Sequence, residues 1–279
     1  MEKKYRNARV SCAAAFLAGV SAYVLSGSAV GLLLIAVAAV AYLGIRERET
    51  SLQFKQLNRS MVRLRQQLEA AMDVRRLLDH RAMPLPPSGG WAASSDFVAL
   101  VGELLVAHRP RHIMELGSGL STIFLADMGD AQDPAQITSL DHDPAYAEQT
   151  RAHLRARDLG AHVRVIDAPL QPLDLSGEQY RWYALPEDFQ CPPIDFLIID
   201  GPPSASCPMS RYPALPVLAP YLAAHCVVVI DDADRPDEKA MVARWAEQFG
   251  GKQRRLPLEK GAVVMFLDQA TYAQTSRHP

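Results

Sequence analysis

One long segment near the start of this 279-residue chain lacks charged side chains. No Asp, Glu, Lys or Arg occurs in the 36 residues from Val10 to Ile45, and a soluble domain of this size has no need for such a run. A single helix of that length would measure about 54 Å, whereas the hydrocarbon core of a bilayer is about 30 Å thick. Because Ser26, Gly27 and Ser28 interrupt the run near its middle, residues 10–45 are predicted to form a transmembrane helical hairpin.

Basic residues flank this run on both sides. Lys3, Lys4, Arg6 and Arg9 precede it, and Arg46, Arg48 and Lys55 follow it. Positive charge marks the cytoplasmic side of a membrane, so residues 1–9 and the chain after the hairpin are expected to be cytoplasmic. One tilted span that begins near Val20 and a cleaved secretory signal are the alternatives. No small-residue cleavage site precedes Val30, which disfavours the signal.

Glycine and proline are absent from residues 46–82, where apolar side chains recur every three or four positions. This spacing predicts an amphipathic stalk helix with a narrow apolar seam formed by Leu57, Met61, Leu64, Leu68 and Ala71. A coiled coil that joins subunits into a homo-oligomer, a basic helix on anionic lipid, and a helix packed on its own domain all fit the pattern. Residues 83–90, rich in Pro and Gly, are predicted to be a linker.

Cysteine is scarce, and charge is divided unevenly along the chain. Cys12, Cys191, Cys207 and Cys226 form no CxxC pair, which disfavours a zinc site and a disulfide scaffold. Residues 1–82 contain 13 Lys and Arg against 6 Asp and Glu, whereas residues 83–279 contain 16 against 25. The chain therefore combines a basic membrane-proximal part with an acidic soluble part, and no nucleic-acid partner is expected.

Beyond Trp91, short apolar runs alternate with helical patterns, which is typical of an α/β fold with a parallel sheet covered on both faces. The predicted strands are residues 111–116, 136–141, 162–166, 194–200, 226–231, 252–256 and 262–267. The predicted helices are residues 96–108, 122–128, 145–158, 215–223 and 238–249. Residues 91–268 are therefore predicted to be one catalytic domain, with residues 269–279 as a tail. Ligands of such sheets bind at the carboxyl ends of the strands.

The first three strands end in residues suited to an adenosyl ligand. Glycines at 117 and 119 follow the first strand and let backbone approach a ligand closely. Asp141 is placed to accept hydrogen bonds from ribose hydroxyls, and Asp167 to face an adenine amino group. Because Thr122 stands where a dinucleotide fingerprint needs its third glycine, a nucleotide-dependent oxidoreductase is disfavoured.

The chain resembles class I S-adenosylmethionine-dependent methyltransferases in four segments, which are, in order, ELGSGLST, SLDHD, VIDAP and FLIIDGPP. It is most similar to the family 24 methyltransferase domains in the segments DGPP, RYPALPVL and IDDADRPDEKAMVARW. The resemblance covers about residues 91–268. It implies a Rossmann-like, doubly wound sheet of seven strands in the order 3-2-1-4-5-7-6, with the last strand antiparallel. The cofactor contacts that it implies are Glu115, Gly117 and Gly119 at the methionine, Asp141 at the ribose, Asp167 and Ala168 at the adenine, and Ser118, Ser121, His142 and Asp200.

Three carboxylates follow two neighbouring strands. Asp200 ends one strand, and Asp231 and Asp232 end the next. Carboxylates crowded together repel one another unless a cation lies between them, and oxygen ligands suit Mg²⁺. The arrangement is similar to the metal site of catechol O-methyltransferase-like enzymes, so the three are predicted metal ligands. Capping of helices and contact with the cofactor alone are the alternatives.

Asp200 and Asp232 are the predicted catalytic residues. Catechol-type enzymes place a lysine three residues beyond the first carboxylate, but position 203 is proline, so Asp232, Asp234 and His142 are the candidate bases. The aromatic segment 173–183 is expected either to cover the substrate pocket or to form an edge hairpin. Arg211 is expected to form an ion pair or to bind an anionic acceptor.

These observations predict a membrane-anchored S-adenosylmethionine-dependent methyltransferase that acts on an oxygen nucleophile with help from Mg²⁺. Membrane attachment favours a lipid or glycan acceptor, although a small soluble molecule fits the same architecture. A non-catalytic scaffold protein that uses a methyltransferase fold is the alternative from a different functional class.

Overall fold

The computed structural model describes residues 2–27, 29–78, 84–88, 92–129 and 133–268. The predicted tail and part of the predicted linker lie outside these residues. The chain divides into two compact units, Met1–Arg65 and Gln66–Pro279.

The first unit is a pair of helices, as the charge-free run predicts. Helix α1 (Glu2–Ser26) and the start of α2 (Ala29–Leu77) are joined through Gly27, whose φ of +62° suits a residue without a side chain. Arg9 donates to Glu49 at 2.7 Å, which ties the two helices together outside their apolar stretches. A Cβ at Gly31 would lie 2.6 Å from the Tyr23 nitrogen, so the missing side chain permits close packing of the helices.

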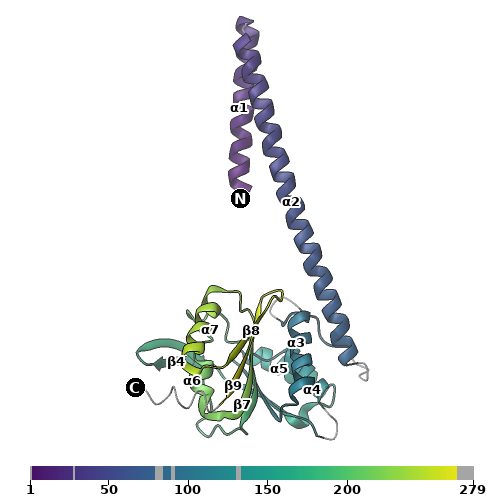
Figure 1. Cartoon of the computed structure of the whole chain (residues 1–279), viewed down its shortest axis with the longest axis vertical. Coiled ribbons are helices and arrows are strands. Elements are labelled where there is room, and N and C mark those ends of the chain that lie inside the picture. The colour runs from purple at the N-terminus through teal and green to yellow at the C-terminus, as the bar shows by residue number, and fades with distance from the viewer. Residues whose placement is uncertain (1, 28, 79–83, 89–91, 130–132, 269–279) are drawn as a thin grey trace. The chain divides into compact units, whose positions relative to one another are not determined.

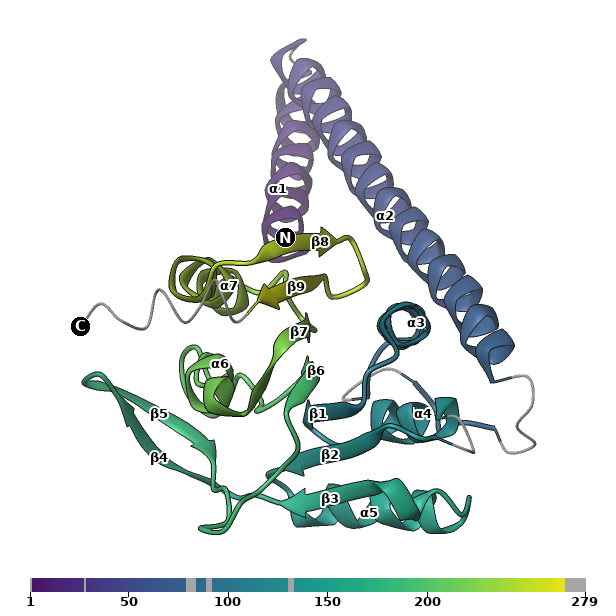
Figure 2. The ribbon, with the colours of Figure 1, turned by 60° about the horizontal axis from the view of Figure 1, so that its bottom comes forward.

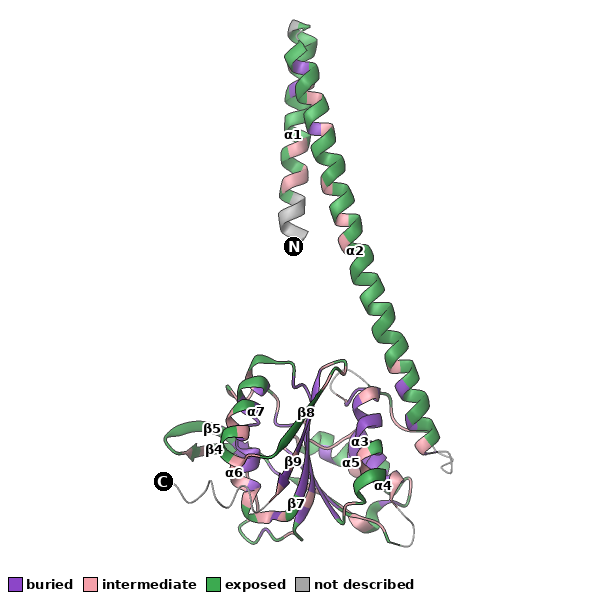
Figure 3. Ribbon diagram, viewed as in Figure 1, coloured by how far each residue is buried: buried purple, intermediate pink, exposed green. Residues whose placement is uncertain are grey.

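Most residues of both helices are exposed in the isolated protein (Figure 3). By length and composition, two helices could cross a membrane: Asn7–Leu25 within α1, and α2. The apolar seam of the predicted stalk is exposed from Leu57 to Leu68, with Leu64 71% accessible. A coiled coil and a lipid-bound helix therefore stay predictions for this stretch.

The last turns of α2 belong to the second unit. Ala70, Val74 and Leu78 are buried in the same apolar cluster as Phe97 and Val101 of α3 (Ser95–His108). Leu77 packs at Gly102 of α3, where a Cβ would come within 2.6 Å of its side chain. Packing on its own domain, one of the three predicted roles of the stalk, therefore applies to its C-terminal end.

A seven-stranded sheet forms the centre of the second unit, in the order β3-β2-β1-β6-β7-β9-β8 (Figure 2). Its strands are β1 (His112–Leu116), β2 (Gln136–Asp141), β3 (Val163–Asp167), β6 (Ile194–Ile199), β7 (Leu222–Ile230), β8 (Lys252–Leu256) and β9 (Ala262–Asp268). All pairs from β3 to β7 are parallel, and β9 is antiparallel to both of its neighbours. The predicted strand order and antiparallel last strand are confirmed.

Helices cover both faces of this sheet (Figure 1). One face carries α3, α4 (Leu120–Met128) and α5 (Pro144–Arg155), and the other carries α6 (Ala214–Leu218) and α7 (Pro236–Phe249). Short 3-10 turns are η1 (Gly160–His162) and η2 (Ala219–Tyr221). The central strands β1 and β6 are mainly apolar, and every residue in them except Asp195 is buried, which is the pattern expected of a sheet covered on both sides.

Two predictions about local structure need comment. The aromatic segment forms a separate hairpin of β4 (Leu170–Leu175) and β5 (Glu178–Tyr183), which was one of its two expected forms. The helix predicted to extend to Ala223 ends at Leu218, and Leu222 already belongs to β7. Pro220 ends the helix because it lacks the N–H that helical bonding needs.

Candidate active site

A cavity of about 250 Å³, which we call the rim cavity, lies at the carboxyl ends of β1, β2 and β6. Its wall contains seven of the residues predicted to bind the cofactor: Gly117, Ser118, Gly119, Ser121, Asp141, His142 and Asp200. Glu115, Asp167 and Ala168 are not among its lining residues. Residues that the sequence analysis predicted at the ends of three different strands therefore line one cavity.

The Asp141 carboxylate joins the first two strand ends. Its Oδ2 accepts from the Ser118 amide at 3.0 Å and from the Ser118 hydroxyl at 2.6 Å. Its Oδ1 accepts from the Asp143 amide at 3.0 Å. Gly117 holds the turn at a φ of +101°, which disfavours other residues. These bonds fix a buried carboxylate in the cavity wall beside the glycine turn.

Glu115 supports the glycine turn from beneath and is fully buried. Its Oε2 accepts from the hydroxyls of Thr122 and Ser139, and the Thr122 hydroxyl in turn accepts from the Gly119 amide. Its Oε1 is buried, and the Ser121 hydroxyl also acts on this carboxylate. Burial raises the pKa of Glu115 to about 7, although these hydroxyls favour the ionised form. Its direct contact with the cofactor stays a prediction.

Replacement of Glu115 by glutamine is expected to remove a pH dependence of stability. The Glu115 carboxyl group keeps its proton up to about pH 7 in the folded state but only up to about pH 4.5 in the unfolded state. The protonated group therefore stabilises the fold at low pH, and this contribution is lost as the pH rises from about 4.5 to 7. Between pH 5 and pH 8 the stability of Glu115→Gln relative to the native chain should increase by about 2 kcal/mol. Urea unfolding of the full chain in detergent, followed by the fluorescence of buried Trp182 and Trp245, measures this difference.

The control is Glu148→Gln on the exposed face of α5, where the flanking arginines lower the pKa of the carboxyl group. This variant should show no such increase with pH. An equal change in both variants, or none in Glu115→Gln, would contradict the assignment of the pH dependence to the buried carboxyl group.

The structure brings the three predicted metal ligands together. One carboxylate oxygen from each of Asp200, Asp231 and Asp232 lies within 4.8 Å of the others. Burial raises the pKa of Asp200 to about 6, opposed by Arg211, and burial raises that of Asp231 to about 7, reinforced by the two other carboxylates. The predicted convergence of charge at this edge is therefore present.

The Arg211 guanidinium lies between two of the three carboxylates, those of Asp200 and Asp232. Arg211 donates from one terminal nitrogen to Asp232 Oδ2 at 2.9 Å and to Asp200 Oδ1 at 3.3 Å. Arg235 contacts Asp232 Oδ1 at 3.0 Å, and the Asp232 amide donates to Asp231 Oδ1 at 2.7 Å. Most of the oxygens that would bind an ion are thus already engaged, so this donor set does not fit Mg²⁺ while Arg211 is in place.

Tyr183, at the end of β5, is a site residue that the sequence analysis did not single out. Its side chain lines the rim cavity, and its buried hydroxyl has no hydrogen-bond partner among the described residues. Burial raises the pKa of Tyr183 well above its usual value, so the phenol keeps its proton and can donate to a bound ligand. The only sequence signal was its position in the aromatic segment suspected of covering the pocket.

Other candidates lie outside the rim cavity. Asp167 accepts from Arg151 at 2.9 Å, and Ala168 is fully buried, with its amide donating to the Asp141 carbonyl at 2.7 Å. Their contact with adenine stays a prediction. Asp234 pairs with Lys239 and Arg255, and Asp232 is held by two arginines. Of the three candidate bases, His142 alone lines the rim cavity, together with Asp200, which was predicted to be catalytic.

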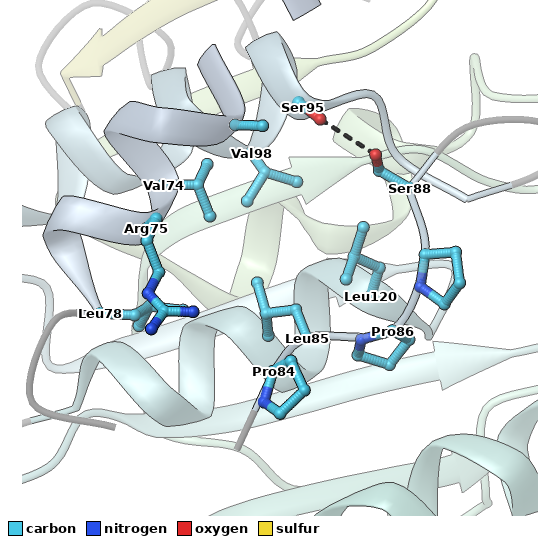
Figure 4. A pocket seen from close by; sticks show the side chains of 12 residues that line it. Val74, Arg75, Leu78, Pro84, Leu85, Pro86, Ser88, Ser95, Val98 and Leu120 are labelled. Carbon is cyan, nitrogen blue, oxygen red and sulfur yellow. Dashed lines mark hydrogen bonds between the residues drawn. The ribbon is translucent and has the colours of Figure 1, made fainter. Parts of the chain in front are cut away.

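A second cavity of about 310 Å³, which we call the linker cavity, lies beside the first (Figure 4). Its wall is made by Ala71, Val74, Arg75 and Leu78 of α2, by Pro84 to Ser88, and by Ser95, Val98 and Leu120. Three residues, Pro86, Pro87 and Leu120, line both cavities. Arg75 is exposed and has no ion pair with any side chain that the structure describes. The cavity is thus largely apolar, with one available cation.

Comparisons with known proteins give one family match and several similar solved structures. A family model described as "Methyltransferase domain" matches residues 114–233. No match was found among curated proteins. Similar solved structures include a putative O-methyltransferase from Klebsiella pneumoniae, with 16% identity, a TM-score of 0.45, and coverage of 72% of this chain and 89% of that one.

The O-methyltransferase from Bacillus cereus in complex with SAH has 16% identity and a TM-score of 0.46, over 73% of this chain and 90% of that one. The O-methyltransferase TomG from Streptomyces achromogenes in complex with SAM has 17% identity and a TM-score of 0.46, over 72% of this chain and 88% of that one. The family match spans the carboxyl ends of β1, β2 and β6, where the rim cavity lies. The resemblance to class I methyltransferases of family 24 that the sequence motifs predict is therefore confirmed over residues 114–233.

Proposed function

We propose that this protein is an S-adenosylmethionine-dependent methyltransferase that modifies an oxygen nucleophile. The observation that carries the proposal is the rim cavity, which combines the glycine turn, a fixed Asp141 carboxylate and Asp200. The Asp141 carboxylate is suited to the ribose hydroxyls, and the turn to the methionine part. Asp200 and Tyr183 line the same cavity and would face the reacting part of a cofactor held there.

Methyl transfer in this site requires mainly orientation and removal of one proton. The acceptor oxygen would form a bond to the methyl carbon while the carbon–sulfur bond breaks. The electron pair of the broken bond would stay on sulfur, which leaves as a neutral sulfide. The acceptor proton passes to the Asp200 carboxylate, which lies in the cavity wall. Tyr183 keeps its proton and orients an oxygen of the bound molecules by donating to it.

We also propose that α1 and the first half of α2 anchor the chain in a membrane as a hairpin, with the catalytic unit in the cytoplasm. The length of both apolar stretches, the Arg9–Glu49 ion pair at their outer ends and the basic flanking residues support this orientation. A membrane anchor places the enzyme at a surface rich in amphiphilic molecules.

The linker cavity suggests the class of acceptor. Its size lies at the lower end of ligand sites, its wall is mainly apolar, and it shares three residues with the rim cavity. Arg75 at its wall is available for an anionic group. We therefore propose a membrane amphiphile as acceptor, with an apolar chain in the linker cavity and a hydroxyl directed toward the rim cavity.

Filling the linker cavity is expected to block lipid methylation. Membranes from producing cells, incubated with methyl-labelled S-adenosylmethionine, should acquire label in the lipid extract only when the chain is present. Ala71 lines the cavity but is exposed, so Ala71→Trp can fill the space at little cost in stability. We expect labelling of the lipid extract to fall at least about tenfold, as for the loss of a binding contact worth 1.4 kcal/mol or more.

Met72→Trp is the matched control, because Met72 is the next residue of α2, is exposed and does not line the cavity. It should label lipid as the native chain does. Label that appears only in a water-soluble product would contradict the lipid acceptor. No transfer to any fraction, together with no binding of S-adenosylmethionine in calorimetry, would contradict the enzyme itself.

A further inference from the structure

The Arg211 side chain is held more tightly than a surface cation requires. It is only 4% exposed. Its terminal nitrogens donate to the Asp200 carbonyl at 2.6 Å and to the Asp231 carbonyl at 3.0 Å, and its Nε to the Pro202 carbonyl at 3.4 Å. With the bonds to Asp200 and Asp232, these carbonyls fix the guanidinium plane between the ends of β6 and β7.

The position of this guanidinium explains how the acidic cluster is tolerated. Three carboxylates crowded at one buried edge need a compensating cation. Arg211 supplies one from within the chain, and Arg235 adds a second at the outer oxygen of Asp232. Asp231 Oδ2 is buried and stays without a partner in the described part of the chain. A divalent ion that binds Asp200 Oδ1 and Asp232 Oδ2 would have to displace Arg211, which donates to both oxygens.

We propose that Arg211 is a built-in cation that replaces the divalent metal at this edge of the methyltransferase site, so that the protein needs no metal. The guanidinium balances the charge of the cluster and positions the Asp200 carboxylate at the rim cavity. Its N–H groups are directed at the chain's own oxygens, so it does not activate the acceptor as a Lewis acid does. Activation of the acceptor then depends on Asp200.

Removal of Arg211 should turn the cluster into a metal site. We compare the full chain in detergent with Arg211→Gln, using Mn²⁺ alone as the probe and the electron paramagnetic resonance signal of free Mn²⁺ as the readout. The native chain should leave that signal unchanged, and it should bind S-adenosylhomocysteine equally well with and without EDTA. Arg211→Gln should bind Mn²⁺ at least about tenfold more tightly than the native chain, and its thermal midpoint should rise in Mg²⁺.

Arg235→Gln is the matched control, since it removes the other guanidinium on Asp232 but leaves Arg211 between Asp200 and Asp232. It should bind no Mn²⁺. Equal binding by both variants would mean that net charge alone matters, and would overturn the proposal. Stoichiometric Mn²⁺ binding by the native chain that Asp200→Asn abolishes would also overturn it.

The native-chain measurements decide the question even where Arg211→Gln fails to fold. Binding of S-adenosylhomocysteine that survives EDTA, without Mn²⁺ uptake, supports the proposal. The role of Arg211 in methyl transfer rests on the proposed function, but its role as the cation of the acidic cluster does not. Different results therefore contradict the two proposals. Absence of S-adenosylhomocysteine binding contradicts the proposed function, whereas Mn²⁺ uptake by the native chain contradicts the role of Arg211.

Discussion

Asp141→Ala is expected to weaken binding of S-adenosylmethionine at least about 100-fold. The carboxylate is 4% exposed, lies in the wall of the rim cavity and is fixed by three hydrogen bonds from Ser118 and Asp143. Each hydrogen bond from a ribose hydroxyl to a charged group contributes about 1.5–3 kcal/mol. Loss of two such bonds corresponds to at least about 3 kcal/mol, which titration calorimetry on the detergent-solubilised chain can measure.

Two further variants separate ribose binding from support of the turn. Asp141→Asn keeps an oxygen that can accept from Ser118, and its affinity should lie between those of the native chain and Asp141→Ala. Asp143→Ala removes the N-terminal cap of α5 in the same loop, which costs about 1 kcal/mol of stability but leaves the cavity wall intact. Native affinity in Asp141→Ala, or an equal loss in Asp143→Ala, would contradict the assignment of Asp141 to the ribose.

Gly201→Ala is expected to abolish ligand binding and to destabilise the fold by about 2 kcal/mol, a typical cost of overpacking a buried site. A Cβ at this position would collide with the buried Tyr183 hydroxyl and would lie 3.1 Å from the Leu116 carbonyl oxygen. Neither group can move away easily, since Leu116 is in β1 and Tyr183 is only 2% exposed. Thermal unfolding and calorimetry with S-adenosylhomocysteine report the two effects.

A second substitution tests whether this collision is the cause. Tyr183→Phe removes the colliding oxygen, so the double variant Gly201→Ala/Tyr183→Phe should recover more than half of the lost stability. Gly160→Ala is the control for added bulk, because a Cβ there meets no atom within 4 Å. If Tyr183→Phe recovers nothing, the steric explanation is wrong.

The strand ends of the site were predictable because a parallel sheet directs all its carboxyl ends to one edge. Gly117, Asp141 and Asp200 each follow an apolar run, and the structure places all three in the rim cavity wall. Residues 91–268 were placed in the correct fold for the same reason. Apolar runs that are buried on both faces stand out in the sequence as strands.

Arg211 was expected to form an ion pair, and it does so with Asp200 and Asp232, but the partners of side chains that reach the site from elsewhere were not predictable from spacing. Arg211 follows β6 by 12 residues, in a turn of a loop rich in Pro and Ser, and only tertiary packing brings it between Asp200 and Asp232. Tyr183 arrives from a hairpin that is not part of the main sheet. The sequence placed Glu115 near the end of a strand. The alternation of side chains along β1 does not reveal whether that of Glu115 faces the ligand or the core.

The burial of Ala70, Val74 and Leu78 against α3 has a practical consequence for preparing a water-soluble form of the enzyme. A fragment that starts in the proline-rich segment would leave the outer side of α3 uncovered, and exposed apolar surface of this kind promotes aggregation. A fragment that starts at Gln66 keeps the last turns of α2, whose apolar side chains cover the outer side of α3. The point of truncation, rather than the choice of buffer, should therefore decide whether the catalytic unit remains soluble without detergent.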